Sequence, residues 1–367
     1  MVILWYGLVP MAGGLIKRYK WHIFRKRFDE LRLSPMLDYR RYSRQGNDSG
    51  GGTFRFVGGF ESITDGQTLW IRGDDLTIPV SLQNAETYLL PMQKGDGIPE
   101  IFDPGDETPE KTQWERVSAL TEGARVYVGG LMVYRDGRWI FASTKKNPLI
   151  VIFYDGPDLS LTTRAIRAGR HRGEYWNTIT PYSLVIGALC QIITAVLFLD
   201  RPAFRLTVIV SLTALFVPLY PMIPPGLLFT VIYRRLAWRS RILRSYRDLA
   251  RLPLRYSGTL PNGELYGFTT SVELPPQAQE GKIPLLLPEL TAKNDLWHIF
   301  GALHFGEDLP VQPQDSFATF GILPGKPEII AKRCGIAAYT MEAIAWLMLF
   351  AGIGLNIFIL SMVLVLL

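Results

Sequence analysis

The chain has 367 residues, a formal net charge of +6 and 48% apolar residues, and its mean hydropathy is positive. This composition indicates a membrane protein with room for one or two modest soluble domains, rather than a transporter made mostly of helices. With two cysteines, Cys190 and Cys334, the chain has no pattern that suggests a disulfide framework.

Residues 1–16 form an apolar segment that is followed by basic residues. A signal peptide is the alternative interpretation, but its basic residues would precede the apolar run, and no small-residue cleavage site follows. We therefore expect a membrane segment. Residues 17–52 join a basic, aromatic stretch to a glycine-rich linker. Residues 17–45 are interpreted either as an amphipathic helix in the membrane interface or as a cytoplasmic extension of the first helix.

Residues 53–157 have the composition of a β domain. Short runs rich in Thr, Val, Ile and aromatic residues are separated by turn signals, and Asp136-Gly137 favours a tight hairpin. Without a long helix among them, these runs predict a small OB-like antiparallel barrel or sandwich. The expected strands are residues 53–60, 67–72, 76–82, 86–92, 125–134, 138–142 and 148–154.

A polar, acidic loop is expected at residues 95–113. Asp103, Asp106 and Glu107 are oxygen ligands of the kind that a divalent cation prefers, but they lack the ordered spacing of an EF-hand loop. We therefore expect a solvated loop and no metal site.

Residues 158–180 contain a short basic helix, and residues 181–233 contain two apolar runs joined by a turn at 200–205. The first run, 181–199, carries no charge and has about the ~20 residues that a membrane-spanning helix needs. The second run is broken by prolines. We expect a transmembrane hairpin with a kinked second arm, since unpaired backbone groups are costly in lipid, and a hairpin buried in a soluble protein is the alternative.

The remaining chain repeats this order of elements. Residues 234–255 are a basic juxtamembrane helix, 256–333 a second, shorter β-rich domain, and 335–367 a final transmembrane helix. Residues 77–82, 126–131 and 147–157 resemble residues 282–287, 297–303 and 315–327 in the same order. We expect a duplicated unit, with chance similarity between β-rich stretches as the alternative.

Basic residues flank all four apolar segments on one side, and such residues mark the cytoplasmic side of a membrane. This predicts both termini and the turn at 200–205 outside, and both β domains in the cytoplasm. It also accounts for the net charge without nucleic acid, because anionic lipid headgroups attract basic residues beside the membrane. The headgroup contacts that we expect come from Arg234, Arg235, Arg239, Arg241 and Arg244.

Small and polar residues recur along one face of the last apolar segment at helical spacing. We expect this face to pack against another helix, with the second segment as a partner surface. A proton or ion path through the carboxylate on this face is the alternative. The residues concerned are Glu342, Ala345, Leu349, Gly352 and Asn356, with Gly187 and Gln191 on the second segment.

Signals for catalysis are nearly absent. The chain contains no phosphate-binding loop, zinc-protease motif, nucleophile elbow or dinucleotide fingerprint. His298 and His304, with Glu307 or Asp308, could form a metal or acid–base site, and neutral strand histidines are the expected interpretation. Four tryptophans are expected in the core or in interfaces rather than stacking on bases: Trp70, Trp114, Trp139 and Trp297.

The stretch at residues 124–131, followed by a hydrophobic strand, a basic helix and a membrane segment, resembles the GIDE-type domain of the mitochondrial ubiquitin ligase activator family and its bacterial relatives. The similarity covers residues 114–199, and more faintly 297–360. It implies a membrane-tethered interaction domain. The ligase activity of the animal relatives resides in a RING with about eight Cys/His ligands. This chain has no such array, so that activity is not implied.

Together these features predict a non-enzymatic membrane protein without a cofactor, anchored in the inner membrane of a bacterium. We expect a scaffold or accessory subunit that binds lipid and recruits other proteins, or copies of itself, through its β edges, its acidic loop and the 342–356 face. The alternatives are a component of a transport or enzyme complex and a protein that binds anionic lipid.

Overall fold

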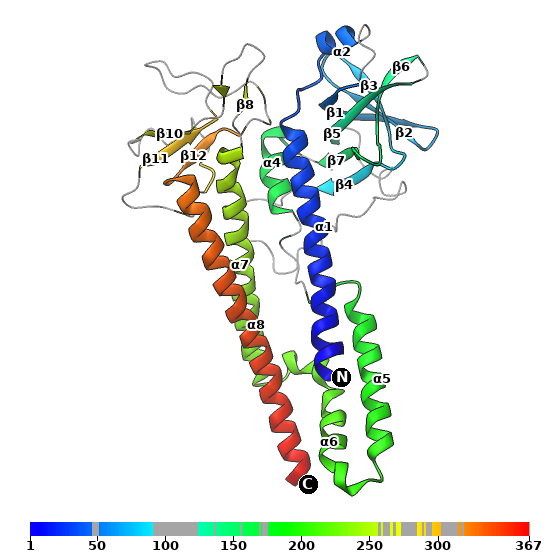
Figure 1. The fold of residues 1–367 in the computed structure, drawn as a ribbon, viewed down its shortest axis with the longest axis vertical. Coiled ribbons are helices and arrows are strands. Elements are labelled where there is room, and N and C mark those ends of the chain that lie inside the picture. Colours follow the sequence, from blue (N-terminus) through cyan, green and yellow to red (C-terminus); the bar gives the residue numbers. More distant parts are fainter. Residues whose placement is uncertain are drawn as a thin grey trace. The chain divides into compact units, whose positions relative to one another are not determined.

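The chain forms two compact units, which we call the helical unit and the β unit (Figure 1). The helical unit contains Met1–Tyr19, Arg170–Asp248 and Glu328–Leu367, and the β unit contains Lys20–Gly169 and Leu249–Pro327. The structure is a computed structural model, and the residues that it describes are 1–45, 51–90, 124–135, 137–154, 156–168, 170, 175–255, 258–259, 265–266, 269–272, 285–287, 290, 296–301, 315, 317 and 319–366.

All seven strands expected in the first β region are present. They form one mixed sheet in the order β1-β2-β3-β6-β5-β7-β4. The strands are β1 (Thr53–Thr64), β2 (Thr68–Arg72), β3 (Thr77–Ser81), β4 (Glu86–Leu90), β5 (Arg125–Arg135), β6 (Arg138–Ala142) and β7 (Ile150–Tyr154).

The turn between β1 and β2 follows from its sequence. Asp65 and Gly66 both adopt left-handed conformations, with φ of 55° and 61°, and aspartate and glycine are among the residues that tolerate them best. β1 is long enough to pair twice. Residues 53–59 pair with β5, and after a change of register between Phe60 and Ser62 the strand pairs with β2.

The expectation of an OB-like antiparallel barrel or sandwich is wrong in two respects. The seven strands form one sheet and not a barrel, and two strand pairs, β3–β6 and β4–β7, are parallel. The reason is that β5 pairs with β7 as well as with β1 and β6, so the sheet continues through β7 to a terminal strand, β4. Alternation predicts strands, but it does not predict which strands pair.

One face of this sheet is covered by helices. Helix α1 (Val9–Arg32) contributes Trp21, Phe24 and Phe28, and helix α4 (Asp158–Arg167) contributes Leu161 and Ala165 to the same buried cluster. The short basic helix expected within residues 158–180 runs from Asp158 to Arg167. Alternate residues of β5 and β7 face this cluster and a second core among the strands, so both strands are buried on both faces.

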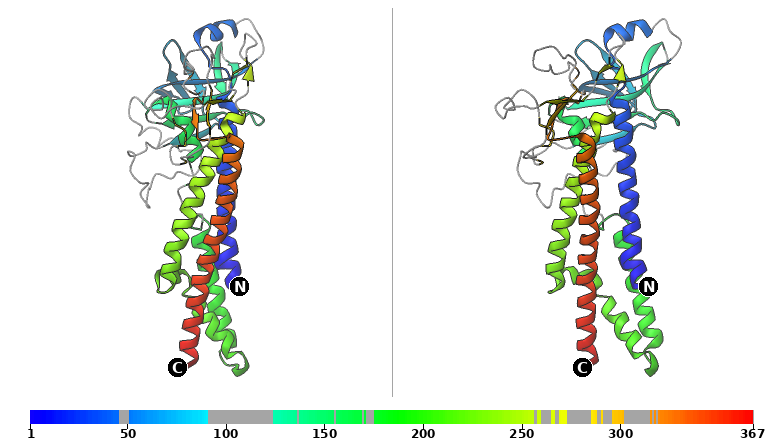
Figure 2. Two further views of the ribbon diagram at one scale, coloured as in Figure 1. Left: turned by 90° about the vertical axis from the view of Figure 1, so that its left-hand side faces the viewer. Right: turned by 60° about the vertical axis from the view of Figure 1, so that its left-hand side comes forward.

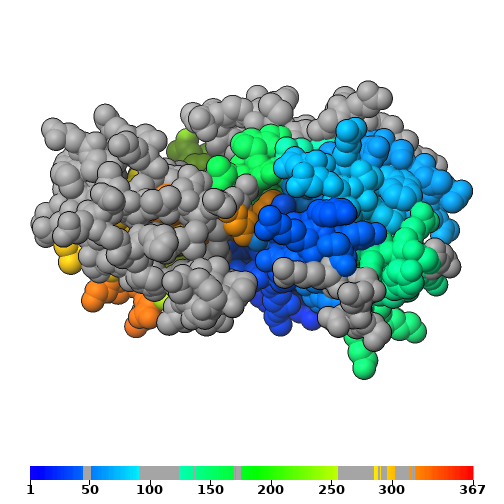
Figure 3. Space-filling model, turned by 90° about the horizontal axis from the view of Figure 1, so that it is seen from above, coloured from blue at the N-terminus to red at the C-terminus, as the bar shows by residue number. Residues whose placement is uncertain are grey.

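Trp21, Phe24 and Phe28 of α1 thus pack on protein, whereas Tyr19 is exposed, and α1 is a single helix from Val9 to Arg32. Of the two interpretations of residues 17–45, this favours an extension of the first helix. A short helix, α2 (Tyr39–Gln45), follows. Seen from above, α2 and the strands up to β4, coloured blue to cyan, form one continuous surface (Figure 3).

The described residues of the second β region form five short strands. β10 (Thr269–Val272), β11 (Trp297–Phe300) and β12 (Gly321–Leu323) form an antiparallel sheet, and β8 (Gly258–Thr259) pairs with β9 (Leu265–Tyr266). Ile299, Phe320 and Ile322 form its small described core.

The helical unit begins with a π-helical turn, η1 (Leu4–Leu8), and the first part of α1. α5 (Thr180–Phe198) and α6 (Arg205–Ala214) form a hairpin through η2 (Pro202–Phe204). η3 (Val217–Met222), α7 (Gly226–Arg255) and α8 (Pro327–Leu366) complete the unit. Every view shows α7 and α8 side by side (Figures 1 and 2).

The second arm of the expected transmembrane hairpin is interrupted rather than merely kinked. It consists of α6, the short 3₁₀ helix η3 and the beginning of α7. Pro218, Pro221, Pro224 and Pro225 lie in or beside the interruption, and proline removes a backbone donor and clashes with the preceding turn. Two helices, α5 and α8, are long and apolar enough to cross a membrane.

Candidate functional site

A cavity of about 380 Å³ lies within the helical unit. Its apolar wall comes from α8, through Ala345, Trp346 and Leu349, and from η3, through Val217 and Pro218. Charged side chains gather elsewhere in the lining: Arg18 of α1, Arg234, Arg241 and Arg244 of α7, and Glu342 of α8. The cavity therefore combines a large apolar wall with a cationic region.

Glu342 lies at the centre of the cationic region. Its Oε1 accepts a hydrogen bond from Arg18, and its Oε2 forms an ion pair with Arg244. The side chains of Glu342 and Arg244 are 17% and 14% exposed, and that of Arg18 is 31% exposed. One carboxylate on α8 thus joins guanidinium groups of α1 and α7.

Burial changes the titration of these arginines without discharging them. The pKa of Arg244 is lowered to about 10, mainly by burial and then by the neighbouring charges of Arg18, Arg170 and Arg247. Burial also lowers the pKa of Arg18. Both guanidinium groups remain protonated at neutral pH, so the cationic region keeps its charge.

The interrupted backbone beside the cavity is stabilised by α8. Asn356 donates two hydrogen bonds through Nδ2, to the carbonyl oxygens of Tyr220 at 2.9 Å and Ile223 at 3.1 Å. Gly226 allows this approach, because a Cβ there would come within 2.3 Å of both Asn356 and the Tyr220 carbonyl oxygen. Val217, Pro218, Pro221 and Met222 of the same segment line the cavity. Irregular backbone next to a cavity is the arrangement that membrane proteins tolerate.

The face predicted on the last segment is a packing surface inside the chain. Ala345, Leu349 and Asn356 are buried, and a Cβ on Gly352 would come within 2.6 Å of Phe229 on α7. This face therefore packs on α7 and η3. The two residues proposed on the second segment also lie in the helical unit. Gly187 faces Trp5 and Tyr6, while Gln191 is buried within the helical unit.

The five arginines predicted at lipid headgroups divide into two groups. Arg234, Arg235 and Arg239 are exposed, whereas Arg241 and Arg244 are partly buried; Arg234, Arg241 and Arg244 line the cavity. From sequence alone, Arg18 was one of the basic residues that flank the first apolar segment, and nothing connected it with Glu342. The one feature of the sequence that could have pointed to Arg18 is its position within one helical turn of the end of the apolar segment at residues 1–16.

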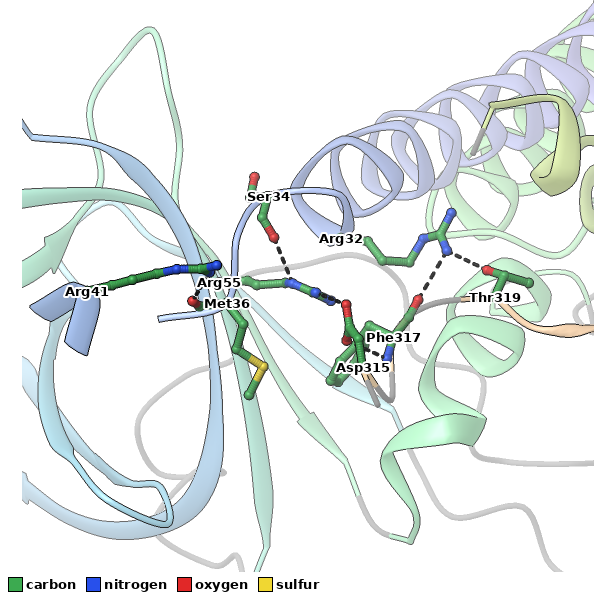
Figure 4. Close-up of polar contacts among 8 residues, drawn as sticks. All are labelled: Arg32, Ser34, Met36, Arg41, Arg55, Asp315, Phe317 and Thr319. Atoms are coloured by element: carbon green, nitrogen blue, oxygen red, sulfur yellow. Dashed lines mark hydrogen bonds and ion pairs between the residues drawn. The ribbon is translucent and has the colours of Figure 1, made fainter. Parts of the chain in front are cut away.

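A second arginine cluster lies in the β unit (Figure 4). Arg55 donates through Nε to the Ser34 carbonyl oxygen at 2.8 Å, pairs with Asp315, and lies over the ring of Phe317 at 5.4 Å. Arg32 donates to the Phe317 carbonyl oxygen at 3.2 Å and to the Thr319 hydroxyl.

The ring of Phe317 is buried against the first β region, with its centroid 5.3 Å from that of Tyr127. We call residues 315, 317 and 319 the latch. They join a segment of the second β region to the first sheet. Burial raises the pKa of Tyr127 in this cluster, so its phenol stays protonated.

The other candidates form no site among the described residues. His298 is buried in β11, and burial, with a smaller contribution from Lys326, lowers its pKa. His304, Glu307, Asp308, Asp103, Asp106, Glu107 and Trp114 lie outside the described residues. In the described part of the chain, no three His, Cys, Asp or Glu side chains are grouped so as to hold a metal, and Cys190 and Cys334 are free thiols.

Comparison of the chain with protein-family models, with curated proteins and with solved structures found no match. The function is therefore argued from the geometry of the cavity and its charged residues.

Proposed function

We propose that this protein spans a membrane several times and binds an anionic amphiphile in the cavity of the helical unit. The observation that carries the proposal is the cavity of about 380 Å³, in which a broad apolar wall meets four arginines and one glutamate. Its volume falls within the range of about 300–1,000 Å³ that is typical of small-molecule sites.

The two parts of the cavity match the two parts of such a ligand. An acyl or other hydrocarbon chain gains about 25 cal/mol for each Å² that it buries against the apolar wall. An anionic headgroup forms charge-assisted hydrogen bonds with Arg244 and Arg18, which are shorter and stronger than neutral ones. Neither a wholly apolar ligand nor a free ion would use both parts.

Three features support the proposed place in a membrane. Helices α5 and α8 are long and apolar enough to cross it. The N-terminus, the C-terminus and the connection from α5 to α6 lie toward one end of the helical unit (Figure 1), whereas the basic residues of α7 follow its apolar beginning. Because basic flanks mark the cytoplasmic side, we propose that both termini lie outside and that the β unit lies in the cytoplasm of a bacterium.

The proposal is tested by measuring ligand binding with one arginine removed. The full chain is purified in an uncharged detergent and titrated with a single-chain lysophosphatidic acid. Arg244→Gln removes a cation from the lining and is expected to weaken binding at least tenfold. Arg239→Gln is the matched control, because Arg239 lies on the same helix, is exposed and does not line the cavity. If Arg244→Gln and Arg239→Gln bind lysophosphatidic acid with equal affinity, the cavity is excluded as the binding site.

A second candidate function is that of a scaffold or accessory subunit that recruits proteins or a second copy of the chain. The observation that favours it is that β4 ends the seven-stranded sheet, since a terminal strand can pair with an added strand. A pull-down in mild detergent, with native mass measurement, tests it. A monomer that retains only lipid would exclude this function. Neither candidate includes a chemical step, so both describe a non-enzymatic protein.

We also propose that the two β regions derive from a duplication. In each, an antiparallel strand pair, β5–β7 or β11–β12, leads into a helix, α4 or α8. Each copy has a left-handed glycine before the helix, Gly156 with φ of 88° and Gly325 with φ of 123°. The parallel bridge between Leu285 and Ile322 has its counterpart in β4–β7. The resemblance of the first copy to a GIDE-type domain stays a prediction.

A further inference from the structure

Glu342 holds the position that the proposed headgroup needs. It is the one acidic residue among the described residues that line the cavity, and each of its two carboxylate oxygens contacts a different arginine. A carboxylate or phosphate ligand bound by Arg18 and Arg244 would use the same guanidinium groups in the same way. The protein's own carboxylate therefore occupies the place that an anionic headgroup bound by these arginines would take.

A smaller hollow of about 80 Å³ is lined in part by Met11, Gly14 and Leu15 of α1. Arg18, Glu342 and Trp346 line both this hollow and the larger cavity. The Glu342 side chain therefore borders a second space besides the larger cavity.

We propose that Glu342 is an internal counter-ion, which a doubly charged headgroup, a phosphate monoester, displaces from Arg244 and Arg18. This inference rests on the proposed function and specifies its ligand class. It follows from the charges that are exchanged. A headgroup with one negative charge replaces the single charge of Glu342 and gains little, whereas a headgroup with two charges leaves a net gain in attraction to the arginines.

The inference predicts a preference between headgroups on the same hydrocarbon chain. A phosphate monoester has a second pKa of about 6 and carries two negative charges at pH 8. A phosphodiester carries one at every pH near neutrality. We expect the full-length protein to bind lysophosphatidic acid at least tenfold more tightly than lysophosphatidylglycerol of equal chain length.

Glu342→Gln tests the origin of this preference. Because Glu342→Gln lacks the competing carboxylate, we expect this variant to bind the phosphodiester at least tenfold more tightly than the natural chain does. The ratio of the affinities for the phosphate monoester and the phosphodiester therefore falls toward one. Glu342→Asp keeps the charge and should keep the preference. Comparable thermal unfolding of the variants shows that folding is intact, and Glu342→Asp provides the comparison if Glu342→Gln folds poorly.

Inorganic phosphate separates a lipid headgroup from free phosphate as the source of the charge. We expect it to compete with lysophosphatidic acid at least tenfold more weakly than a second amphiphile does, and equal competition would overturn the assignment to an amphiphile.

The two proposals fail in different ways. If Arg244→Gln binds as well as Arg239→Gln, the cavity is not the binding site and the proposed function fails. If Arg244→Gln loses binding, but the natural chain binds both headgroups equally and Glu342→Gln changes neither affinity, the proposed function stands and the counter-ion inference is wrong.

Discussion

The two arginine clusters of this protein differ in what surrounds their charges. In the β unit, Arg32 and Arg55 are 1% and 5% exposed, and the ring of Phe317 and several backbone carbonyl oxygens enclose them. In the helical unit, Arg18 and Arg244 also contact a carboxylate, but they border a cavity of about 380 Å³. Similar ion pairs therefore lie in close-packed surroundings in the β unit and beside a cavity in the helical unit.

This difference separates a structural role from a binding role. A buried ion pair by itself is weak evidence for either, because structural networks also bury charges. In the latch, the groups around the arginines are parts of the chain, so removing one is expected to cost stability. Beside the cavity, the same change is expected to alter ligand binding more than folding.

The largest expected effect is that of Phe317→Ala in the latch. The substitution removes a buried ring from Tyr127 and Arg55, and truncating a buried phenylalanine typically costs about 3–5 kcal/mol of the free energy of unfolding. Thermal unfolding in detergent, followed by tryptophan fluorescence, measures it. Leu159→Ala at an exposed position of the β unit is the control. A shift no larger than that of the control would show that the latch does not hold the β unit together.

The comparison is sharpened by neutralising one carboxylate in each cluster. Asp315→Asn leaves the buried guanidinium of Arg55 without its charged partner and is expected to cost about 2 kcal/mol, less than a fully buried pair because the Asp315 side chain is 36% exposed. Glu342→Gln is expected to cost less than about 1 kcal/mol in the same unfolding measurement, because Arg18 and Arg244 border a cavity in which water can solvate their guanidinium groups. The reverse order of the two effects would contradict the assignment of roles.

Filling the cavity is expected to have a smaller effect, and on binding alone. Ala345 is buried and lines the cavity, so Ala345→Leu places a larger side chain against the ligand's chain. We expect affinity for lysophosphatidic acid to fall about tenfold, which corresponds to about 1.4 kcal/mol. Ala343→Leu, at an exposed position on the same helix, is the control in the same titration. Unchanged binding by Ala345→Leu would place the ligand elsewhere.

The smallest expected effect concerns pH. Burial lowers the pKa of His298 in the folded chain below the value of about 6.5 that it has when unfolded. As pH falls below about 6.5, the unfolded state binds a proton that the folded state does not, so stability decreases. His298→Asn should reduce the loss of thermal stability between pH 7.5 and 5.5, while His22→Asn, at an exposed position, should not. An identical loss in both variants would show that His298 does not contribute.

Much of the local structure was predictable from sequence. The alternation of residues in the first β region predicted all seven strands, and the apolar runs predicted α5 and the later part of α8. The turn at Asp65-Gly66 also follows from local sequence, because both residues tolerate the left-handed conformation that they adopt. These features depend on neighbouring residues, whose spacing and backbone preferences are visible in any short window.

The pairing of strands and the location of the cavity were not predictable in this way. β4 pairs in parallel with β7, and the paired residues Glu86 and Ile150 are 64 positions apart in the sequence. The alternation of apolar and polar residues predicts each strand, but it does not predict this pairing or the order β5-β7-β4. The helical face from Glu342 to Asn356 was predicted, but its partner was not, since Gly187 faces Trp5 and Tyr6 instead.

By itself, the sequence determined where the apolar segments, the strands and the basic flanks lie, because periodicity and charge are properties of neighbouring residues. Only the tertiary structure decided that Arg18 and Glu342, 324 residues apart, share a hydrogen bond, and that Arg244 forms an ion pair with the same carboxylate beside the cavity. Such a site depends on how helices from three parts of the chain pack, and packing brings together residues that no local pattern relates.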